Sequence, residues 1–243
     1  MRLNGFRHGD HCTRDYLAGL SVGSVLDVGC GDGAFTRILA ESLGSFEELR
    51  GVDPDKDSVD EARQLTDDRR IGYRVLADSE LQRSDERFDL VTISNALHHL
   101  SHPIASIRRL IRYLAPAGML LVREMVSDGL APAEENSREI HHAKAEVDRA
   151  CGRVHNATYT REQIRRIVHE GSGGWQFVFS CEEHSPVERE SDALPYVRDY
   201  ITHLTDDTLA HELERRLDEV AVSVREVGVA QPPRLTLVCR RNE

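Results

Sequence analysis

Short apolar runs alternate with segments of helical period along the first half of the chain. The runs are rich in valine, leucine and isoleucine, and they predict strands at 24–28, 48–53, 72–77, 88–94 and 118–124. Helical periodicity falls at about 11–20, 33–43, 57–68 and 103–115. Strands and helices that alternate in this way are typical of a parallel sheet covered by helices on both faces.

This alternation breaks after Glu124. Residues 127–158 are polar and contain histidines, and we expect the middle of this segment, 133–150, to be helical. In YTREQIRRIVHEG, Thr160 and Gln163 have capping-box spacing and Gly171 stands at the end, which predicts another helix. WQFVFS (175–180) and RLTLVCR (234–240) predict two more strands, expected as an antiparallel addition.

One apolar stripe lies between these last two strands. It recurs at steps of three and four residues and ends at Gly228; its members are Leu209, Leu213, Leu217, Val220, Val224 and Val227. The stripe is interpreted either as core or as the face of a homodimer. The expected fold is therefore α/β, a doubly wound, mostly parallel seven-stranded sheet in a single domain, 1–243. Helical insertions at 127–158 and 187–228 are expected to roof the active site.

Composition narrows the functional class. The chain has 243 residues, 40% hydrophobic and 30% charged, and no apolar run approaches the ~20 residues that cross a bilayer. The N-terminus lacks the apolar core of a secretory signal, so a cytoplasmic location is expected. A net charge of -11 without a long basic cluster disfavours a nucleic-acid partner. The five cysteines are odd in number and form no CxxC pair, so reduced thiols are expected.

The stretch VLDVGCGDGAF, residues 25–35, is an apolar strand that ends in closely spaced glycines. Bare backbone before a helix lets a ligand approach the helix N-terminus. Gly29, Gly31 and Ala34 satisfy the dinucleotide pattern, with Asp53 about 20 residues further on. Asp27, inside the strand, would repel a pyrophosphate but attract a ligand that carries an amino group and a sulfonium. The sequence therefore favours a ligand that is cationic near the glycines.

VLDVGCGDGAF resembles the first motif of the class I S-adenosylmethionine-dependent methyltransferases, and GVDPDKDSVDEAR (51–63) resembles the segment that follows it. RFDLVTISNALHHL and LAPAGMLLVREM are similar to the family's fourth and fifth strands, so the resemblance covers roughly residues 20–125.

This resemblance implies a Rossmann-like methyltransferase fold with S-adenosyl-L-methionine as cofactor. It implies that the glycine turn receives the methionine and ribose part, that Asp53 holds both ribose hydroxyls and that Asp78 contacts the adenine. The cofactor-binding residues carried over in this way are Asp27, Gly29, Cys30, Gly31, Asp53, Pro54, Asp78, Ser79, Asn95 and Ala96.

Methyl transfer from a sulfonium requires alignment of the acceptor, and a base where an oxygen or carbon acceptor must lose a proton. Histidines titrate nearest to neutrality, so the catalytic candidates are His98, His99 and His142. Glu124, in the segment that leaves the fifth strand, is a further catalytic candidate. His8 and His11 belong to an N-terminal segment that folds as a lid in similar enzymes. Tyr159 and Arg161 are further candidates for the site.

A divalent metal is the other chemical option for this region. Glu124, Asp128, His141, His142 and His155 offer oxygen and imidazole ligands, although their spacing matches no metal motif. On a helix His141 and His142 point about 100° apart, so both cannot easily face one ion, and a solvated helix is the favoured interpretation. Whether a metal takes part stays open.

The leading hypothesis is a methyltransferase that acts on a small molecule, with the oxygen, carbon or nitrogen acceptor unresolved and with neither nucleic acid nor membrane as partner. A nicotinamide-dependent oxidoreductase is the second hypothesis, against which Asp27 and the Asp78 segment count. A non-catalytic cofactor-binding subunit that works through the stripe from Leu209 to Val227 is the third.

Overall fold

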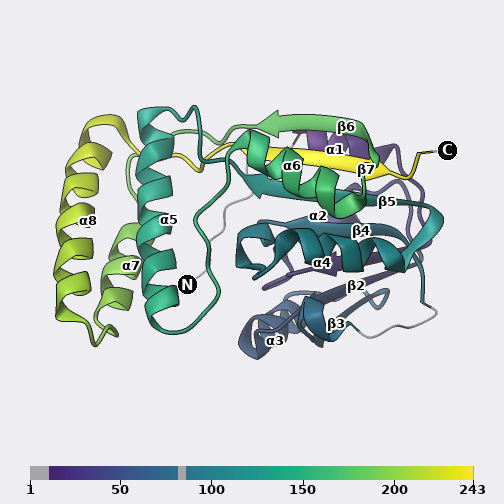
Figure 1. Cartoon of the computed structure of the whole chain (residues 1–243), viewed down its shortest axis with the longest axis horizontal. Coiled ribbons are helices and arrows are strands. Elements are labelled where there is room, and N and C mark those ends of the chain that lie inside the picture. Colours follow the sequence, from purple (N-terminus) through teal and green to yellow (C-terminus); the bar gives the residue numbers. More distant parts are fainter. Residues whose placement is uncertain (1–10, 82–85, 243) are drawn as a thin grey trace.

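A computed structural model describes residues 11–81 and 86–242. Figure 1 shows a twisted sheet flanked by helices, with further helices standing at one end of it. The seven strands are β1 (Ser24–Val28), β2 (Glu48–Asp53), β3 (Ile71–Val75), β4 (Phe88–Ser94), β5 (Leu114–Met125), β6 (Gln176–Glu183) and β7 (Arg234–Arg240). All seven predicted strands are confirmed, and β5 begins four residues earlier than predicted.

The eight α-helices of the described residues are α1 (His11–Ala18), α2 (Ala34–Ser42), α3 (Lys56–Gln64), α4 (Pro103–Leu110), α5 (Pro132–Ala150), α6 (Arg161–Ser172), α7 (Ala193–Ile201) and α8 (Asp207–Val227). Short 3-10 turns follow β3, β4 and α4, at Asp78–Glu80 (η1), Leu97–His99 (η2) and Ile111–Tyr113 (η3). The predicted helix at 103–115 is thus divided between α4 and η3, and the one at 57–68 ends at Gln64.

The strand order is β3-β2-β1-β4-β5-β7-β6, which confirms the doubly wound sheet. β1 to β5 pair in parallel, and the order reverses between β1 and β4, which is where ligands of such sheets bind. The expected antiparallel addition of the last two strands is confirmed, since both of their pairings are antiparallel. β7 runs antiparallel to β5 and to β6, so β6 points the same way as the first five strands.

The centre of the sheet is buried on both faces. Val25 of β1 packs on one side with Leu17 of α1 and Leu39 of α2, whereas Leu26 packs on the other side with Leu110 of α4. Alternate residues of a strand point to opposite faces, so a strand covered on both sides is apolar throughout. The central strands β1, β4 and β5 are largely buried and apolar for this reason, whereas the edge strands β3 and β6 are more exposed.

Helices α5, α7 and α8 form a layer of their own beyond the carboxyl ends of the parallel strands (Figure 1). Four members of the predicted stripe are buried there, namely Leu213, Leu217, Val220 and Val224, packed with Ile140 and Val147 of α5 and Val197 of α7. The interpretation of the stripe as a dimer face is therefore corrected: it is core. Only its ends are more open, with Leu209 half-buried and Val227 43% exposed.

Helix α6 continues one residue beyond its predicted end at Gly171. Its C-cap is Gly173, which has the left-handed backbone (φ 72°) that glycine adopts without steric cost. Gly171 serves packing instead, because a Cβ built there would lie 2.7 Å from Cβ of Ile107 in α4. The close approach of α4 and α6 accounts for that glycine.

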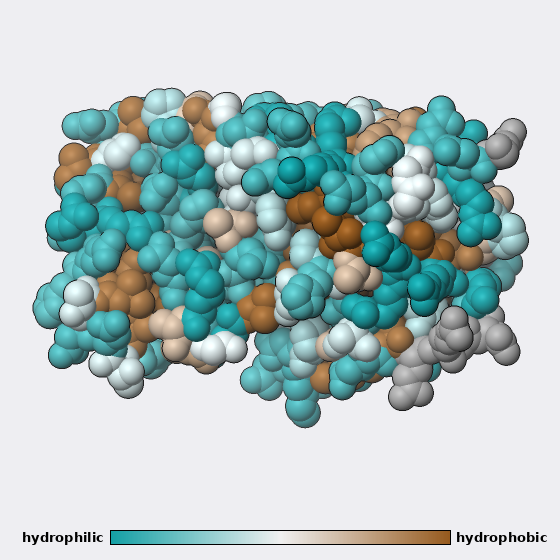
Figure 2. Space-filling model, in the orientation of Figure 1, coloured by the Kyte–Doolittle hydropathy of each residue, from teal (hydrophilic) through white to brown (hydrophobic). Residues whose placement is uncertain are grey.

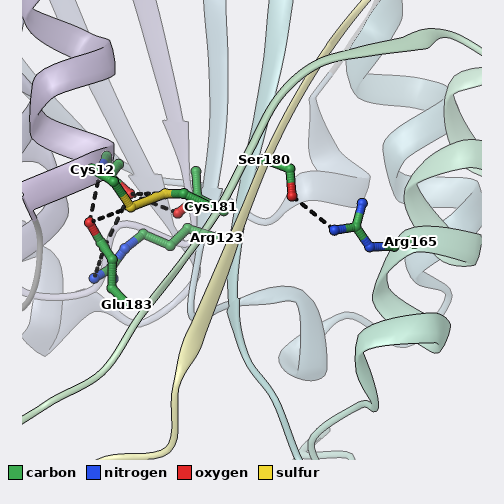
Figure 3. The surroundings of a disulfide bond; sticks show 8 residues. Cys12, Arg123, Arg165, Ser180, Cys181 and Glu183 are labelled. Atoms are coloured by element: carbon green, nitrogen blue, oxygen red, sulfur yellow. Dashed lines mark hydrogen bonds and ion pairs between the residues drawn. A yellow bond between two sulfur atoms is a disulfide. The ribbon is translucent and has the colours of Figure 1, made fainter.

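The expectation of reduced thiols is wrong for two of the five cysteines. A disulfide joins Cys12 of α1 to Cys181 of β6, 169 residues apart, whereas Cys30, Cys151 and Cys239 are free. Figure 3 shows Arg123 and Glu183 beside this bond. Glu183 Oε1 accepts the Thr13 backbone N–H at 2.9 Å, and Glu183 Oε2 lies 3.5 Å from Nη2 of the buried Arg123. Sequence spacing could not reveal a pair that only the fold brings together.

Within the described part of the chain, no helix has the length and apolar character needed to cross a bilayer. On the face drawn in Figure 2, hydrophobic residues form small patches separated by hydrophilic ones.

Candidate active site

The three glycines between β1 and α2 have different physical reasons to be glycine. Gly29, Gly31 and Gly33 all have positive φ, at 71°, 52° and 76°. A Cβ at Gly29 would meet Cβ of Ala96 at 2.4 Å, and one at Gly33 would meet the Tyr73 hydroxyl at 2.5 Å. A Cβ at Gly31 would have no heavy atom within 4 Å. Gly31 therefore lies beside open space where a ligand can approach the backbone.

Asp53, at the end of β2, is connected to this turn. Its Oδ2 accepts the Gly31 N–H at 2.9 Å, and its Oδ1 accepts the Asp55 N–H at 2.9 Å. Burial raises the pKa of Asp53, and the two backbone N–H bonds oppose that rise. A carboxylate has about four acceptor sites, so two remain for the hydroxyls of a ligand. Pro54, which follows, is exposed.

The side chain of Asp27 does not have the environment that was predicted for it. It is 1% exposed, and its two oxygens accept the hydroxyls of Thr36 in α2 and Thr92 in β4, each at 2.6 Å. Direct contact between Asp27 and a cationic ligand is therefore not supported. Burial raises the pKa of Asp27 to about 6, against the two hydroxyl bonds, so the group is ionised at pH 7 and its charge lies beneath the turn.

Asn95 and Ala96 lie between the glycine turn and the histidines. Ala96 forms the close contact with Gly29, which places the end of β4 against the turn. Asn95 has a left-handed backbone (φ 49°), and its Oδ1 is buried without a hydrogen-bond partner among the described residues. Buried polar atoms without a partner are rare in folded proteins, so this oxygen is suited to a ligand's donor.

The remaining cofactor candidates lie within the glycine turn and in η1, which follows β3. Cys30 is buried with Val59, Ala62 and Tyr73, and burial raises its thiol pKa, so its backbone rather than its sulfur is available. Asp78 accepts a bond from Nη2 of Arg109 at 2.7 Å, and Ser79 beside it is exposed. The Asp78 carboxylate thus has a cationic partner within the protein, and its contact with a nucleobase stays a prediction.

Glu124 and His98 form a buried pair at the carboxyl ends of β4 and β5. His98 Nδ1 lies 2.9 Å from Oε1 of Glu124, and both side chains are at most 1% exposed. Glu124 also accepts the backbone N–H groups of Leu97 and Met125, at 2.9 and 2.8 Å. Burial would raise the pKa of Glu124, but His98 and these hydrogen bonds lower it below its usual value. Glu124 is therefore an ionised acceptor that orients the imidazole.

A second pair of the same kind lies next to the first. His155, in the loop after α5, is 1% exposed, and its Nδ1 lies 2.7 Å from Oδ2 of Asp148. Asp148 also accepts from Lys144 Nζ at 2.6 Å and from the Tyr200 hydroxyl at 2.8 Å. Burial opposes ionisation of Asp148, yet His155 and Lys144 lower its pKa to about 2.

His141 completes this group from α5. Its Nε2 lies 3.1 Å from Nε2 of His155, and its ring centroid lies 5.0 Å from that of His98. Burial and the neighbouring rings lower the pKa of His141 well below its ordinary value, so it is a neutral imidazole at pH 7. We call His98, His141 and His155 the histidine triad.

The other two predicted histidines lie at the border of the triad. The His99 ring is 4.2 Å from that of His155, centroid to centroid, and its Nδ1 lies 3.4 Å from the Val154 carbonyl. His142 points away, as the helical spacing predicts: its Nε2 lies 2.9 Å from Oγ1 of Thr158. The fold thus brings His98 and Glu124 together, puts His99 beside them and leaves His142 out.

The structure also shows where most of the weaker candidates for the site lie. Asp128 and Glu182 pair with Arg161, and Asp128 is not part of the group that His98, His141 and His155 form. Tyr159 is half-buried, and burial together with Glu124 raises its pKa. His11 is exposed on α1, against β6, and His8 lies outside the described residues.

Asp148 is the residue of this region that sequence reasoning missed. It lies seven residues after His141, which is two turns of α5, so both belong to one face of the helix. That spacing was available in the sequence. The contact with His155 was not, because it depends on how the loop at 151–160 folds back.

The whole arrangement places an open glycine turn with a carboxylate beside a group of oriented imidazoles. Such a site can bind a nucleoside at the switch point of the sheet and position a proton acceptor or a metal next to it. Comparison with known proteins agrees with this geometry: the family model of the methyltransferase domain matches residues 12–171, more than half of the chain. The chain belongs to the methyltransferase-domain family.

Individual relatives differ in their chemistry. The chain is 35% identical over 109 residues to a ubiquinone biosynthesis O-methyltransferase of Alkalilimnicola ehrlichii, a match that covers 43% of the chain and 42% of that protein. It is 33% identical over 118 residues to a ubiquinone/menaquinone biosynthesis C-methyltransferase of Ectopseudomonas mendocina, covering 46% of each. The chain thus matches less than half of the length of these two methyltransferases.

A solved structure shows the same fold. The N-methyltransferase NodS from Bradyrhizobium japonicum, in complex with S-adenosyl-L-homocysteine, superposes with a TM-score of 0.52 at 16% identity, covering 96% of this chain and 86% of that one. At this identity the likeness concerns the fold, and it confirms the expected Rossmann-like methyltransferase architecture.

Proposed function

We propose that this protein transfers a methyl group from S-adenosyl-L-methionine to a small-molecule acceptor. Membership of the methyltransferase-domain family supports the reaction. The observation that carries the cofactor assignment is the turn at Gly31, where open space lies directly beside the carboxylate of Asp53. The net charge of -11 supports a small molecule rather than nucleic acid as the acceptor.

The residues present fit such a cofactor. Asp53 retains acceptor capacity for two ribose hydroxyls, and the bare backbone at Gly31 leaves room for the nucleoside. Asn95 Oδ1 offers an unused acceptor at the end of the neighbouring strand. The bound cofactor supplies an electrophilic methyl group, and these residues bind and orient it while the imidazoles face the acceptor.

Related methyltransferases leave the acceptor atom open. One of the two relatives named above is an O-methyltransferase and the other a C-methyltransferase. The layer of α5, α7 and α8 beyond the strand ends, with the loop after α5, supplies two of the triad histidines, and we propose that it roofs the acceptor pocket. Incubation with radiolabelled S-adenosylmethionine and a cell extract, followed by identification of the labelled compound, would name the acceptor.

The role of Asp53 is testable by calorimetry. We expect S-adenosylmethionine to bind and NAD not to bind. Asp53→Asn should weaken the affinity for S-adenosylmethionine by about 10-fold or more, because an amide accepts fewer hydrogen bonds than a carboxylate and each lost bond costs ~1–3 kcal/mol. Asp55→Asn is the matched control, because asparagine caps the start of α3 as well as aspartate does. Equal affinity in the wild type and Asp53→Asn would contradict the assignment, and tight NAD binding would overturn the proposed function.

A further inference from the structure

The three rings of the histidine triad lie close enough together to reach one ion. One ring nitrogen from each of His98, His141 and His155 lies within 4.8 Å of the other two. Two nitrogens bound to one tetrahedral zinc ion lie about 3.3 Å apart, since each Zn–N bond is about 2.0–2.1 Å. The separation of 3.1 Å between Nε2 of His155 and Nε2 of His141 is close to that value.

Two buried carboxylates set the orientation of the rings. Glu124 faces Nδ1 of His98, and Asp148 faces Nδ1 of His155. An ionised carboxylate only accepts hydrogen bonds, so each ring donates to its carboxylate through Nδ1, which leaves Nε2 as the nitrogen that can bind an ion. A carboxylate behind a ligating histidine is the arrangement that fixes the tautomer in metal sites.

The backbone around the triad is also fixed. Asn156 donates its backbone N–H to the His98 carbonyl at 2.8 Å, and its side-chain amide donates to the carbonyls of His98 and Leu100 at 3.1 Å. Arg149 donates to the His155 carbonyl at 2.6 Å. The loop after α5 is thereby held against η2, so the imidazoles are brought together before any ion binds.

We propose that His98, His141 and His155 bind one divalent transition-metal ion of the zinc type. Imidazole nitrogens suit zinc, cobalt, nickel, copper and iron, whereas magnesium and calcium prefer oxygen ligands. Three protein ligands leave the fourth position of a tetrahedral ion open, as in catalytic zinc sites. His141 is half-buried, which leaves the site accessible from the side of α5.

This inference rests on the proposed function where it concerns the acceptor. An acceptor whose hydroxyl reaches the open position of the ion loses its proton to solvent more readily, because the positive charge lowers the hydroxyl pKa. The hydroxyl oxygen then donates an electron pair to the methyl carbon. The carbon–sulfur bond breaks, and its electron pair goes to sulfur, so a methyl ether and a neutral sulfide are formed. The metal site thus predicts a hydroxyl-bearing acceptor.

The test uses the untagged 243-residue protein without any methyl donor. Metal-stripped protein is titrated with Co²⁺ and, in competition, with Zn²⁺. We expect one equivalent to bind with the intense visible absorption of four-coordinate Co²⁺, and we expect Zn²⁺ but not Mg²⁺ at the same concentration to displace it. His141→Ala should abolish this absorption, and Asp148→Asn should weaken binding by 10–100-fold.

The matched control is His142→Ala, which removes the adjacent imidazole on α5 that contacts Thr158 instead of the triad. It should bind Co²⁺ as the wild type does. His141 is half-buried, and circular dichroism of His141→Ala and its affinity for S-adenosylmethionine would show that the variant is folded. Absence of stoichiometric binding, or unchanged binding in His141→Ala, would overturn the metal site and leave the cofactor assignment untouched.

Acetohydroxamic acid, a small compound with an ionisable hydroxyl, tests the open position. We expect it to change the spectrum of the Co²⁺-loaded protein. An unchanged spectrum at saturating Co²⁺ would overturn the prediction of a hydroxyl-bearing acceptor.

Discussion

Asp27 is ionised at neutral pH although it is buried, and this affects stability as well as the site. Its oxygens connect β1 to Thr36 in α2 and to Thr92 in β4, beneath the glycine turn. Two hydroxyl donors compensate only part of the loss of water, so the pKa stays raised, at about 6. Asp27, which lies next to the glycines in the sequence, thus supports the glycine turn through its bonds to α2 and β4.

The stability of the protein should therefore depend on pH through Asp27. The folded protein keeps this proton up to about pH 6, whereas the unfolded chain releases it near 3.8. Between these values the folded state binds more protons, so this group's contribution to the free energy of unfolding falls as pH rises, by about 3 kcal/mol in total. Asp27→Asn removes that dependence.

Urea unfolding at several pH values between 4 and 7 would measure it. The difference in unfolding free energy between the wild type and Asp27→Asn should decrease by about 2–3 kcal/mol across this range. Any constant effect of the amide on the threonine bonds cancels in the comparison. Parallel profiles for the two proteins would show that Asp27 does not titrate in this range.

Single residues differ in how far their roles could be predicted. The turn that joins Gly29, Gly31 and Asp53 was predicted from residue type and spacing, because a left-handed turn and a strand-end acid have strong local signatures. Their contact with a cofactor stays a prediction. Asp148 and the contacts of Asp27 were not predicted. Both depend on partners from other elements, and no local pattern carries that information.

At the scale of elements, α1 shows what periodicity alone leaves out. Its helical pattern was recognised, but its attachment to β6 through Cys12 and Cys181 was not, because the two cysteines are 169 residues apart. β6 itself was recognised as a strand, but its direction depends on its position at the edge beside β7. Elements follow from local sequence, whereas their partners follow from the fold.

The disulfide should stabilise the protein by restricting the unfolded chain. We expect Cys12→Ser to lower the free energy of unfolding by about 2–4 kcal/mol under non-reducing conditions. Cys151→Ser is the control, since Cys151 is free and exposed and should change stability little. In dithiothreitol the wild type should become nearly as unstable as Cys12→Ser. If neither Cys12→Ser nor dithiothreitol lowers the free energy of unfolding, the two sulfurs are not bonded in solution.

At the scale of the whole molecule, the alternation of strands and helices was sufficient to predict the sheet and the edge at which the candidate site is built. It was not sufficient to predict how the C-terminal helices dock. The predicted insertions contain α5, α7 and α8, which pack together beyond the strand ends (Figure 1). Two triad histidines come from α5 and its following loop, so the complete site exists only when this helical layer is assembled against the sheet.

Mutations in the apolar stripe of α8 test whether this face of the helix is core or a dimer interface. Leu217 is 1% exposed and packs in the cluster shared by α5, α7 and α8, whereas Val222 on the same helix is 48% exposed. Leu217→Ala should therefore lower the free energy of unfolding by about 2–5 kcal/mol, because a cavity remains where the side chain was. Val222→Ala should change it by less than about 0.5 kcal/mol.

Sedimentation equilibrium of Leu217→Ala and the wild type measures the oligomeric state and so distinguishes a core residue from a dimer face. A dimer face would lose its association when Leu217 is truncated, and the monomer would keep most of its stability. Truncation of a core residue has the opposite effect: the free energy of unfolding falls, and the oligomeric state stays that of the wild type. A shift of Leu217→Ala to a smaller species with unchanged unfolding free energy would therefore contradict the packing of α8 on α5 and α7, and with it the placement of the layer that supplies His141.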